Sequence, residues 1–395
     1  MQNNMNSIGH TSANLNNSIT SLGNNTSNAV GNMQNNLNRL NQTNNNIATQ
    51  TARNTRNMQD SFNKLSQASS SIAGLGIGAG ITALGAESIQ TVSKFDDIMA
   101  RVKATTGATT EEFEKLRKQA IDLGATTAWS ASQSAEGMTY LAMAGWDVNQ
   151  IYDAMPGMLA LASAGALDLG RAADIASDVM TAMGMEAEEA GHMADVLAKA
   201  ATSSNTSVEL LGETMKYAAP VAHTFGASLE DTTAIAAKMA DAGIKGSMSG
   251  TALRMGMNRL AAPTKNAKKW LDDLGVATTD ASGNMRDITD IIRDLEKGMD
   301  KLSNSERIQA ASKIFGVEAM SAWLAAIDAG SDSIEELSDK LVNSNGYALE
   351  TAAIMEDTLG GAFRALSGAW ESLMISFGDE MKPVVIKIAE WLQMI

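Results

Sequence analysis

The residues of this sequence that could support catalysis or metal binding are few and scattered. Histidine occurs only as His10, His192 and His223. None belongs to an H-E-x-x-H arrangement, which would place two imidazoles and a general base on one helix face. His192 and Asp195 would be helix neighbours, but one such pair supplies too few ligands for a zinc site. We therefore predict structural histidines and no metal site.

The serine and acidic side chains likewise form no recognisable catalytic pattern. Ser163 and Ser249 lie near glycines, but G-x-S-x-G occurs nowhere on a strand-turn-helix pattern. Glu136 is the best-placed acid, and its position early in a predicted helix is explained by the helix dipole. No acid stands in an aromatic-rich stretch of the kind that would bind sugar. We predict no catalytic residues, no cofactor and no enzymatic activity.

The charge of the chain argues against nucleic acid as a partner. The formal net charge is -15, and an acidic chain is repelled by phosphate backbones. The small basic run Lys265, Lys268 and Lys269 beside Trp270 is therefore predicted to be a solvated helix face. Cysteine is absent, which excludes disulfides and thiolate chemistry. The start of the sequence has no basic region followed by an apolar run, so we expect a cytoplasmic origin.

The segment Gly74–Ala86, G-L-G-I-G-A-G-I-T-A-L-G-A, breaks the composition of the chain. Its glycine spacing is not that of a nucleotide-binding loop, and no G-K-[ST] follows. The uncharged run is shorter than the roughly 20 residues of a transmembrane helix. Glycines four apart favour close helix contact. We predict a hinge or a tight helix contact here, with membrane contact as the alternative.

Helical periodicity dominates the sequence after this segment. Proline occurs four times and methionine 25 times, a composition that favours helices packed through Ala, Leu and Met. Kinks or boundaries are expected at Pro156 and Pro220. A small β-hairpin is expected in Leu271–Ile288, where β-branched residues flank a D-A-S-G-N turn. The predicted helices are 81–104, one capped by Thr109 or Thr110 and closing at Gly124, 130–144, 149–164, 170–183, 187–201, 207–225, 229–242, 247–261, 287–301, 305–314, 318–329, 332–342 and 347–377.

The last predicted helix begins at Pro383 and runs to Ile395 without a cap or a polar tail. A sequence that stops inside an apolar helix suggests a longer parent protein.

Residues 1–72 differ in composition from the rest of the chain. Twenty of them are asparagine, and their sparse apolar residues recur at steps of three, four and seven, as in a coiled coil. Two interpretations stay open: a disordered polar tail, and a weak helix that is stable only when several copies associate, which we prefer. The apolar positions are Ile8, Leu15 and Leu22, then Met33, Leu37, Leu40 and Ile47, then Met58, Phe62, Leu65 and Ile72.

The centre of the chain contains blocks of one construction: a Ser or Asp, an Ala/Met/Leu-rich helical run, then Gly. They lie at Thr127–Trp146, Met155–Gly165 and Ala242–Arg254. The sequences S-A-S-Q-S-A-E-G-M-T-Y-L-A-M-A-G-W, A-D-V-L-A-K-A-A-T-S-S-N-T-S-V, G-E-T-M-K-Y-A-A-P-V-A and A-D-A-G-I-K-G-S-M-S-G-T-A-L-R resemble, in order and spacing, the core of phage tail tape-measure proteins. L-D-D-L-G-V and D-A-S-G-N-M-R-D extend the resemblance, which covers Phe95–Gly316.

The resemblance implies a structural scaffold. Members of this family lie in several copies along the tail axis while tube proteins polymerise around them, and their length sets the tail length. It implies self-association, contacts with tail tube proteins and with baseplate or tail-assembly chaperone proteins, and contact with the host membrane on release. The location would be the host cytoplasm during assembly and then the lumen of the virion tail. Peptidoglycan-cleaving domains of the family are not visible here, and many relatives continue beyond the equivalent of Ile395.

We therefore expect a mainly α protein. Its predicted parts are a polar coiled-coil-like or disordered arm (1–72), a Gly-rich hinge or helix contact (73–86), a compact helical core with one small hairpin (87–330) and C-terminal helices (331–395). The expected function is that of a tail-length ruler and assembly scaffold. The alternative is a membrane-active or cell-wall-acting effector of a tail-like particle, which the Gly-rich segment and the apolar C-terminal helix would support.

Overall fold

The regular structure of the protein is helical, which confirms the predicted mainly α class. The computed structural model describes the backbone of residues 77–393 and the side chains of residues 87–380. The predicted arm (1–72) lies outside the described residues, and Gly74–Ala86 is described only from Ile77. The helices are α2 (Ile77–Thr106), α3 (Thr110–Thr126), α4 (Ala131–Met143), α5 (Val148–Gly165), α6 (Leu169–Met183), the 3-10 turn η1 (Ala187–Glu189), α7 (Ala190–Ser203), α8 (Val208–Phe225), α9 (Leu229–Asp241), α10 (Ser247–Ala261), α11 (Lys265–Leu274), α12 (Ile288–Met299), α13 (Asn304–Phe315), α14 (Met320–Ala329), α15 (Ser331–Val342), α16 (Tyr347–Glu356) and α17 (Leu359–Gln393).

The starts of the helices follow from local sequence. In nine of the helices from α3 to α16 a Ser, Thr or Asp side chain accepts a hydrogen bond from a backbone N–H of the first turn, which satisfies a donor that the helix itself leaves free. At Thr109 and Ser130 the third helical residue, Glu112 or Gln133, also reaches back to the cap backbone. The capping residues are Thr109, Ser130, Asp147, Asp168, Ser207, Ser228, Thr264, Asp287 and Ser303.

Two helix ends differ from the sequence prediction. Gly124 does not close its helix, since α3 continues to Thr126. Gly124 lies against α4 instead, where a Cβ would stand 2.4 Å from the Ala131 nitrogen. Gly165 likewise stays inside α5, and the next residue, Ala166, takes the left-handed conformation that ends the helix, with φ 50°. That conformation costs an alanine about 1–2 kcal/mol, so packing of the chain after α5 decides this end.

Neither internal proline ends its helix. Pro156 lies within α5 and Pro220 within α8. Pro156 has no N–H to give to the Tyr152 carbonyl one turn earlier. The side chain of Gln119 on α3 compensates, because its Nε2 donates to the Tyr152 oxygen at 2.6 Å. The proline thus opens an acceptor on α5 that a neighbouring helix uses.

The helix predicted over 347–377 is wrong as a single element. It is broken at Asp357 and Thr358, between α16 and α17. The Thr358 hydroxyl accepts from the Gly361 N–H at 3.0 Å, which is a local start signal for a new helix. The predicted start at Pro383 is also wrong, since α17 runs through it to Gln393.

The predicted hairpin is wrong as well. The described residues contain no strand, only one antiparallel bridge between Thr279 and Met285. The turn itself is present: the Asp280 carboxylate accepts from the N–H groups of Ser282 at 2.8 Å and Asn284 at 2.9 Å. Arms this short, with no further strand to pair with, do not extend into a sheet.

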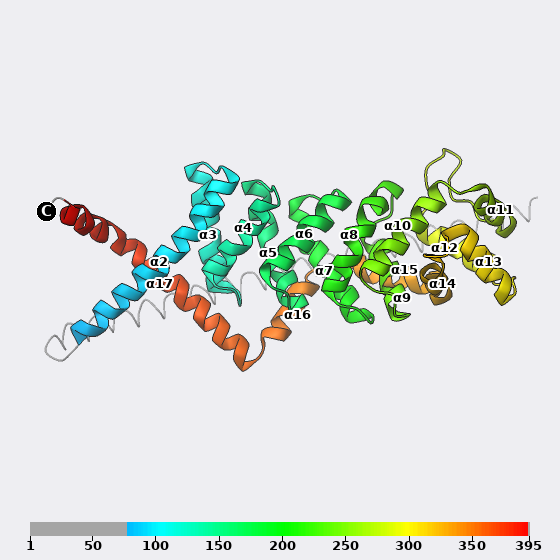
Figure 1. The fold of residues 1–395 in the computed structure, drawn as a ribbon. Coiled ribbons are helices and arrows are strands. Elements are labelled where there is room, and N and C mark those ends of the chain that lie inside the picture. The colour runs from blue at the N-terminus through cyan, green and yellow to red at the C-terminus, as the bar shows by residue number, and fades with distance from the viewer. Residues whose placement is uncertain (1–76, 394–395) are drawn as a thin grey trace, which may run out of the picture. The chain divides into compact units, whose positions relative to one another are not determined.

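Within residues 84–395, which form one compact unit, the chain runs out along a row of helices and then returns. Successive helices from α3 to α10 pack against their neighbours in the row. The last three helices then pack on that row in reverse order: α15 on α9, α16 on α7 and α5, and α17 on α3 (Figure 1). The boundaries predicted at residues 72, 86 and 330 stay predictions.

The core near α10 shows how tightly these helices pack. Trp323 is fully buried and stacks on Phe315, with ring centroids 4.7 Å apart and planes inclined by 6°. Its indole N–H donates to the Ala252 carbonyl at 2.8 Å, so its polar atom is satisfied. A Cβ at Gly256 would lie 2.0 Å from the indole nitrogen. Only glycine leaves room for the Trp323 ring here.

Candidate functional site

A set of polar side chains on α7 makes defined contacts with other helices. They are separated by three, four and three residues, so they share one face of the helix. This face contacts the start of α16 and, through its first member, α9. We call the set the α7 anchor, and its members are His192, Asp195, Lys199 and Thr202.

Asp195 caps α16 from another helix. Its two carboxylate oxygens accept from the backbone N–H groups of Gly346 at 2.6 Å and Ala348 at 2.7 Å. These are donors that α16 cannot satisfy itself, and the carboxylate also interacts favourably with the helix dipole. Asp195 is 6% exposed. This burial raises the pKa of its carboxyl group, against the opposing effect of the two backbone hydrogen bonds.

Lys199 and Thr202 hold the first residue of α16. The Lys199 ammonium lies 4.1 Å from the centroid of the Tyr347 ring, a cation–π distance. The Tyr347 hydroxyl is hydrogen-bonded to the Thr202 hydroxyl at 2.9 Å. One aromatic side chain is thus held at its face and at its polar tip by two residues of α7.

His192 connects α7 to α9. Its Nε2 lies 2.6 Å from a carboxylate oxygen of Glu230. The hydrogen bond to Glu230 raises the pKa of His192, and the Asn345 side chain contributes in the same direction. The hydrogen bond from His192 correspondingly lowers the pKa of Glu230. Both shifts favour the ion pair.

Chemically, the α7 anchor is suited to holding helices together. Both oxygens of Asp195 and one nitrogen of His192 are engaged by α16 and α9, so no reactive pair faces an open cavity. Among the described residues there is no group of three or more His, Cys, Asp or Glu side chains that could hold a metal ion. We interpret the α7 anchor as a device that positions α16 and, through it, α17.

A cleft of about 460 Å³ lies where α16 and α17 return over the start of the row. Two of the residues that line it belong to the sequence blocks Thr127–Trp146 and Met155–Gly165. Trp129 precedes α4 and Ser163 belongs to α5, and the indole N–H of Trp129 donates to the Ser163 hydroxyl at 2.9 Å. Leu349 on α16 and Ala365 on α17 form the opposite side. Ser163, considered above as a nucleophile, therefore serves as an acceptor between two segments.

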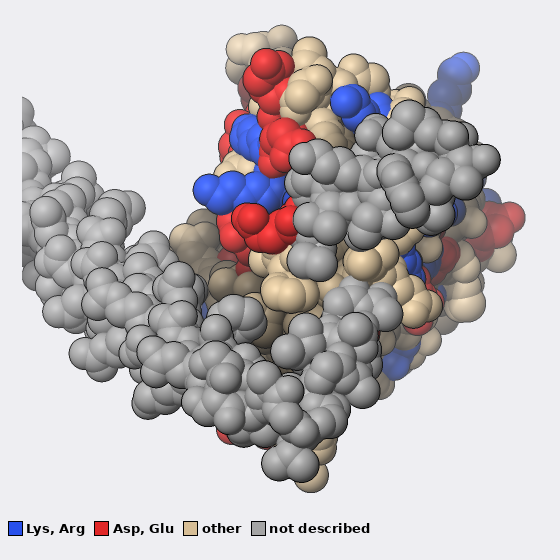
Figure 2. Space-filling view, turned by 90° about the vertical axis from the view of Figure 1, so that its left-hand side faces the viewer, with Lys and Arg blue, Asp and Glu red and all other residues tan. Residues whose placement is uncertain are grey.

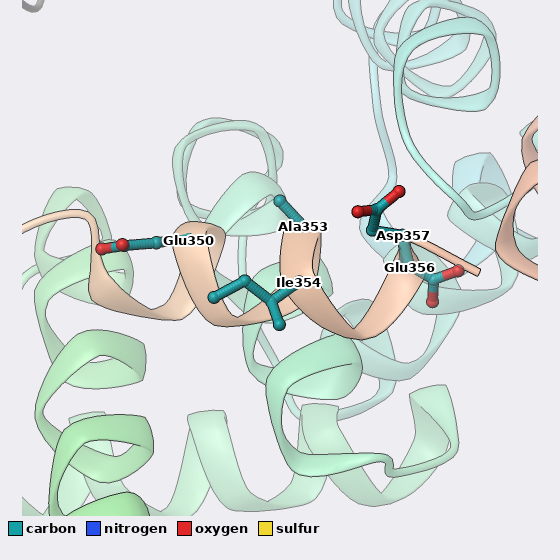
Figure 3. Close-up of a pocket in the computed structure, with 5 residues that line it drawn as sticks. All are labelled: Glu350, Ala353, Ile354, Glu356 and Asp357. Carbon is teal, nitrogen blue, oxygen red and sulfur yellow. The ribbon is translucent and has the colours of Figure 1, made fainter.

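A second, more open pocket of about 480 Å³ lies along α16 itself. Figure 3 shows Glu350 toward one end and Glu356 with Asp357 at the other, with Ala353 and Ile354 between them. Glu356 is paired with Arg364, whose Nη2 lies 2.6 Å from the carboxylate. The pocket thus extends along α16 to the break before α17.

The other candidates of the sequence do not form a site. Glu136 is half-buried on α4. The ring of His223 on α8 lies against Gly184, where a Cβ would stand 2.9 Å from its Cε1. Ser249 on α10 is buried, with its hydroxyl 3.6 Å from the Met239 sulfur. No hydrogen bond joins these three in the described part of the chain, and His10 lies outside it.

The basic run belongs to α11 and is exposed. Lys268 pairs with Asp272 one turn later at 3.0 Å, and Trp270 is partly buried against the core. These contacts fit the predicted solvated helix face.

Figure 2 shows the end of the molecule opposite to α11. Among the described residues on that face, acidic and basic side chains lie interspersed.

No single helix among the described residues is long and apolar enough to span a membrane. The pair α13 and α14, bent by 118° at the break between them, meets the criteria of length and composition together.

Sequence reasoning paired Asp195 with His192 but missed Lys199 and Thr202. The signal was available: in a helix otherwise rich in Ala, Val and Leu, these polar residues recur at helical spacing. What the sequence could not supply was their partner, the segment around Tyr347, which lies 145 residues away from Thr202 along the chain.

Comparison with known proteins gives consistent matches. Residues 117–316 match the family of phage-related minor tail proteins. The chain is 42% identical over 321 residues to a protein of Pneumococcus phage Dp-1 named tape measure protein, covering 79% of this chain and 28% of that protein. It is 32% identical over 323 residues to the probable tape measure protein of Escherichia phage P2, covering 80% of this chain and 40% of that protein. The chain therefore spans less than half the length of either relative. No solved structure matches it.

The family match covers half of the chain, and it includes α4 to α10 together with the α7 anchor. It also falls within the region in which the sequence blocks resemble tape-measure proteins. The chain belongs to the tape-measure family of phage-related minor tail proteins.

Proposed function

We propose that this chain is part of a tail tape-measure protein, which acts as a length ruler and assembly scaffold inside the tail tube. The observation that carries the proposal is the 42% identity over 321 residues to a protein named tape measure protein. The proposal concerns a whole protein of which this chain corresponds to a part, since it spans 28% of that relative.

The contacts of the α7 anchor support a scaffold rather than an enzyme. Its polar side chains, which could in principle do chemistry, are committed to joining helices: Asp195 to α16, His192 to α9 and Thr202 to Tyr347. In a scaffold such contacts have a direct use, because the folded part must keep its form while other proteins polymerise around it.

The partners follow from the proposed role. Several copies of the chain associate along the tail axis, tail tube proteins assemble around them, and baseplate or tail-assembly chaperone proteins meet the ends. Assembly takes place in the host cytoplasm, and the protein then occupies the lumen of the virion tail. It contacts the host envelope when it is released on infection.

Tail length measured by electron microscopy tests the ruler. An in-frame deletion of 28 residues within residues 1–72 of the complete gene removes four heptads and keeps the apolar seam in register. If the segment is helical and lies along the axis, the tail should shorten by about 42 Å. The change must appear as whole tube rings, so the length distribution should move in steps.

A deletion of equal length within Thr127–Ala262 is the matched control. It removes helices from a packed core, so we expect failed or uncontrolled assembly in place of a proportionate shortening. Tails of unchanged length from the first deletion would contradict a measuring role for residues 1–72. Normal tails from the second would contradict the scaffold role of the core.

A further inference from the structure

The first half of α17 presents a row of large apolar side chains to solvent. The exposed fractions are 76% for Leu359, 64% for Phe363, 65% for Leu366 and 43% for Trp370, and the indole of Trp370 also contacts Glu87. We call these four residues the α17 stripe. Their steps of four, three and four are those of a coiled-coil seam. Soluble proteins seldom leave such a row uncovered.

The opposite face of α17 is the one that packs on the protein's own core. Its buried positions include Gly361, Gly368 and Ile375, which are spaced by seven residues. A Cβ at Gly361 would stand 1.9 Å from the Glu356 carbonyl oxygen, and one at Gly368 would stand 2.7 Å from the Gly124 carbonyl oxygen. The helix therefore turns glycines inward and aromatic residues outward, the reverse of an ordinary surface helix.

Polar contacts hold α17 in this orientation. The Glu371 carboxylate accepts from the Ser132 N–H at the start of α4, at 2.8 Å. The Ser372 hydroxyl donates to the Ile121 carbonyl at 3.2 Å. Both contacts lie on the side away from the α17 stripe, so turning the stripe into the core would break them. The α17 stripe is therefore exposed as long as α17 packs on α3 and α4 through these contacts.

The positions beside the stripe indicate what can cover it. Gly360, Ala362, Ser367 and Ala369 are small and uncharged, so another helix can approach closely without like charges meeting. This matters because the chain carries a net charge of -15, so two copies repel each other on average. A seam of this kind is complementary to itself. The α17 stripe faces away from the core of its own chain. Two copies that pack along the stripe therefore keep their cores on the outer sides of the contact.

We propose that the α17 stripe is the surface through which copies of this chain associate, with their α17 helices parallel and in register. The parallel direction rests on the proposed function, because a ruler along a tail axis has one polarity for all its copies. The partner is thus a second copy of this chain, joined residue to like residue along Leu359, Phe363, Leu366 and Trp370.

Site-directed cross-linking tests the contact, and the chain has no cysteine that would interfere. The variant L366C of the full chain places a thiol in the stripe, and V317C places one at an equally exposed apolar position elsewhere, at 67% against 65%. With a short bis-maleimide at micromolar protein concentration, we expect at least about tenfold more cross-linked dimer from L366C, since association raises the local thiol concentration. Adding F363E to L366C should remove this excess without changing the helical circular dichroism.

Each other outcome would overturn the inference. Equal dimer yields from L366C and V317C would exclude the stripe as the contact. Cross-links formed only when L359C is mixed with W370C would mean antiparallel copies. A thiol in L366C that stays monomeric but becomes protected on adding anionic phosphatidylglycerol vesicles would mean a membrane surface. None of these outcomes contradicts the proposed ruler function, because that function is tested separately by tail length.

Discussion

The ion pair between His192 and Glu230 makes the stability of the α7 anchor depend on pH. The pKa of His192 is raised above its ordinary 6.5, so its stabilising effect is complete below pH 6.5 and is lost as the pH rises through the raised value. The pKa of Glu230 is lowered from 4.5, so its effect is present above 4.5 and is lost as the pH falls through the lowered value. The pair therefore stabilises most between pH 4.5 and 6.5.

Thermal unfolding of the wild type and of H192Q from pH 5 to 9 measures this effect. We expect the wild type to be more stable near pH 5–6, by on the order of 1 kcal/mol for a partly exposed pair, and the difference to shrink toward pH 9. The buried Asp195 also acts on His192, so E230Q and the double variant H192Q/E230Q are needed to isolate the pair. A pH-independent difference would contradict the assignment.

At the same scale, helix starts have a local cause that not every helix end shares. A start depends on one side chain and the N–H groups beside it, so Ser130 and Asp147 could be identified from local sequence. The end of α5 depends on a more distant part of the chain. Gly165 was the expected closing residue, yet Ala166 takes the left-handed conformation, and Gly165 packs against Val208, where a Cβ would have only 3.0 Å. That contact is distant in sequence and could not be predicted.

At the scale of elements, the contact between Gln119 and α5 gives a prediction about two helices. The Q119A variant should lose about 1 kcal/mol of unfolding free energy, because the Tyr152 carbonyl is left without its donor. In a P156A background the backbone N–H at position 156 is restored and can take over this carbonyl. The cost of Q119A should then be much smaller, which urea denaturation of the four variants measures. Equal costs in both backgrounds would contradict the explanation.

The dependence of α16 on α7 gives a second prediction at this scale. An asparagine in D195N has only one oxygen for the two N–H groups that Asp195 binds, and it lacks the charge that favours the helix dipole. We expect a loss of about 1–2 kcal/mol, concentrated in α16. Hydrogen exchange should show faster amide exchange in Tyr347–Glu356 while α8 and α10 are unchanged.

S338A is a matched control for D195N. It removes a different contact between the returning helices and the row, the 2.6 Å hydrogen bond to Asp231, and should leave exchange in α16 unchanged. Uniformly faster exchange throughout the core in D195N would mean that Asp195 stabilises the whole protein and not α16 in particular.

The C-terminal helices also mark the limit of periodicity. The apolar spacing of residues 347–377 predicted one long helix, since apolar positions alone do not reveal the break at Thr358. Periodicity likewise identifies an apolar face without saying what covers it. On α17 the face with Gly361 and Gly368 packs against the core, and the face with Phe363 and Leu366 is exposed.

For the whole molecule, the fold class could be predicted and the path of the chain could not. Alanine, methionine and leucine at helical spacing favour packed helices, and the mainly α class is confirmed. The return of α15, α16 and α17 over α9, α5 and α3 joins segments that are far apart in the sequence. No local pattern specifies such pairings.

The return path predicts that residues 331–395 cannot be removed without damage to the rest. Ile334 and Leu341 on α15 are fully buried, and Ala348 on α16 is 1% exposed. A buried leucine or isoleucine contributes about 1.5–3 kcal/mol, and domains have only about 5–15 kcal/mol in total. A chain that ends at Gly330 also exposes the faces of α9, α7 and α5 that these helices cover. We expect it to unfold at lower urea concentration, to lose cooperativity and to bind the dye ANS.

A chain that ends at Glu380 is the control for this truncation. It keeps α15, α16 and the part of α17 that contains Gly368, Glu371 and Ser372, through which α17 contacts α3 and α4. Its urea midpoint should stay close to that of the full chain. If the chain ending at Gly330 unfolded at the same midpoint and as cooperatively as the control, residues 331–395 would be an independent unit. In that case α16 would contribute nothing to the stability of the row, and the α7 anchor would serve only to position it.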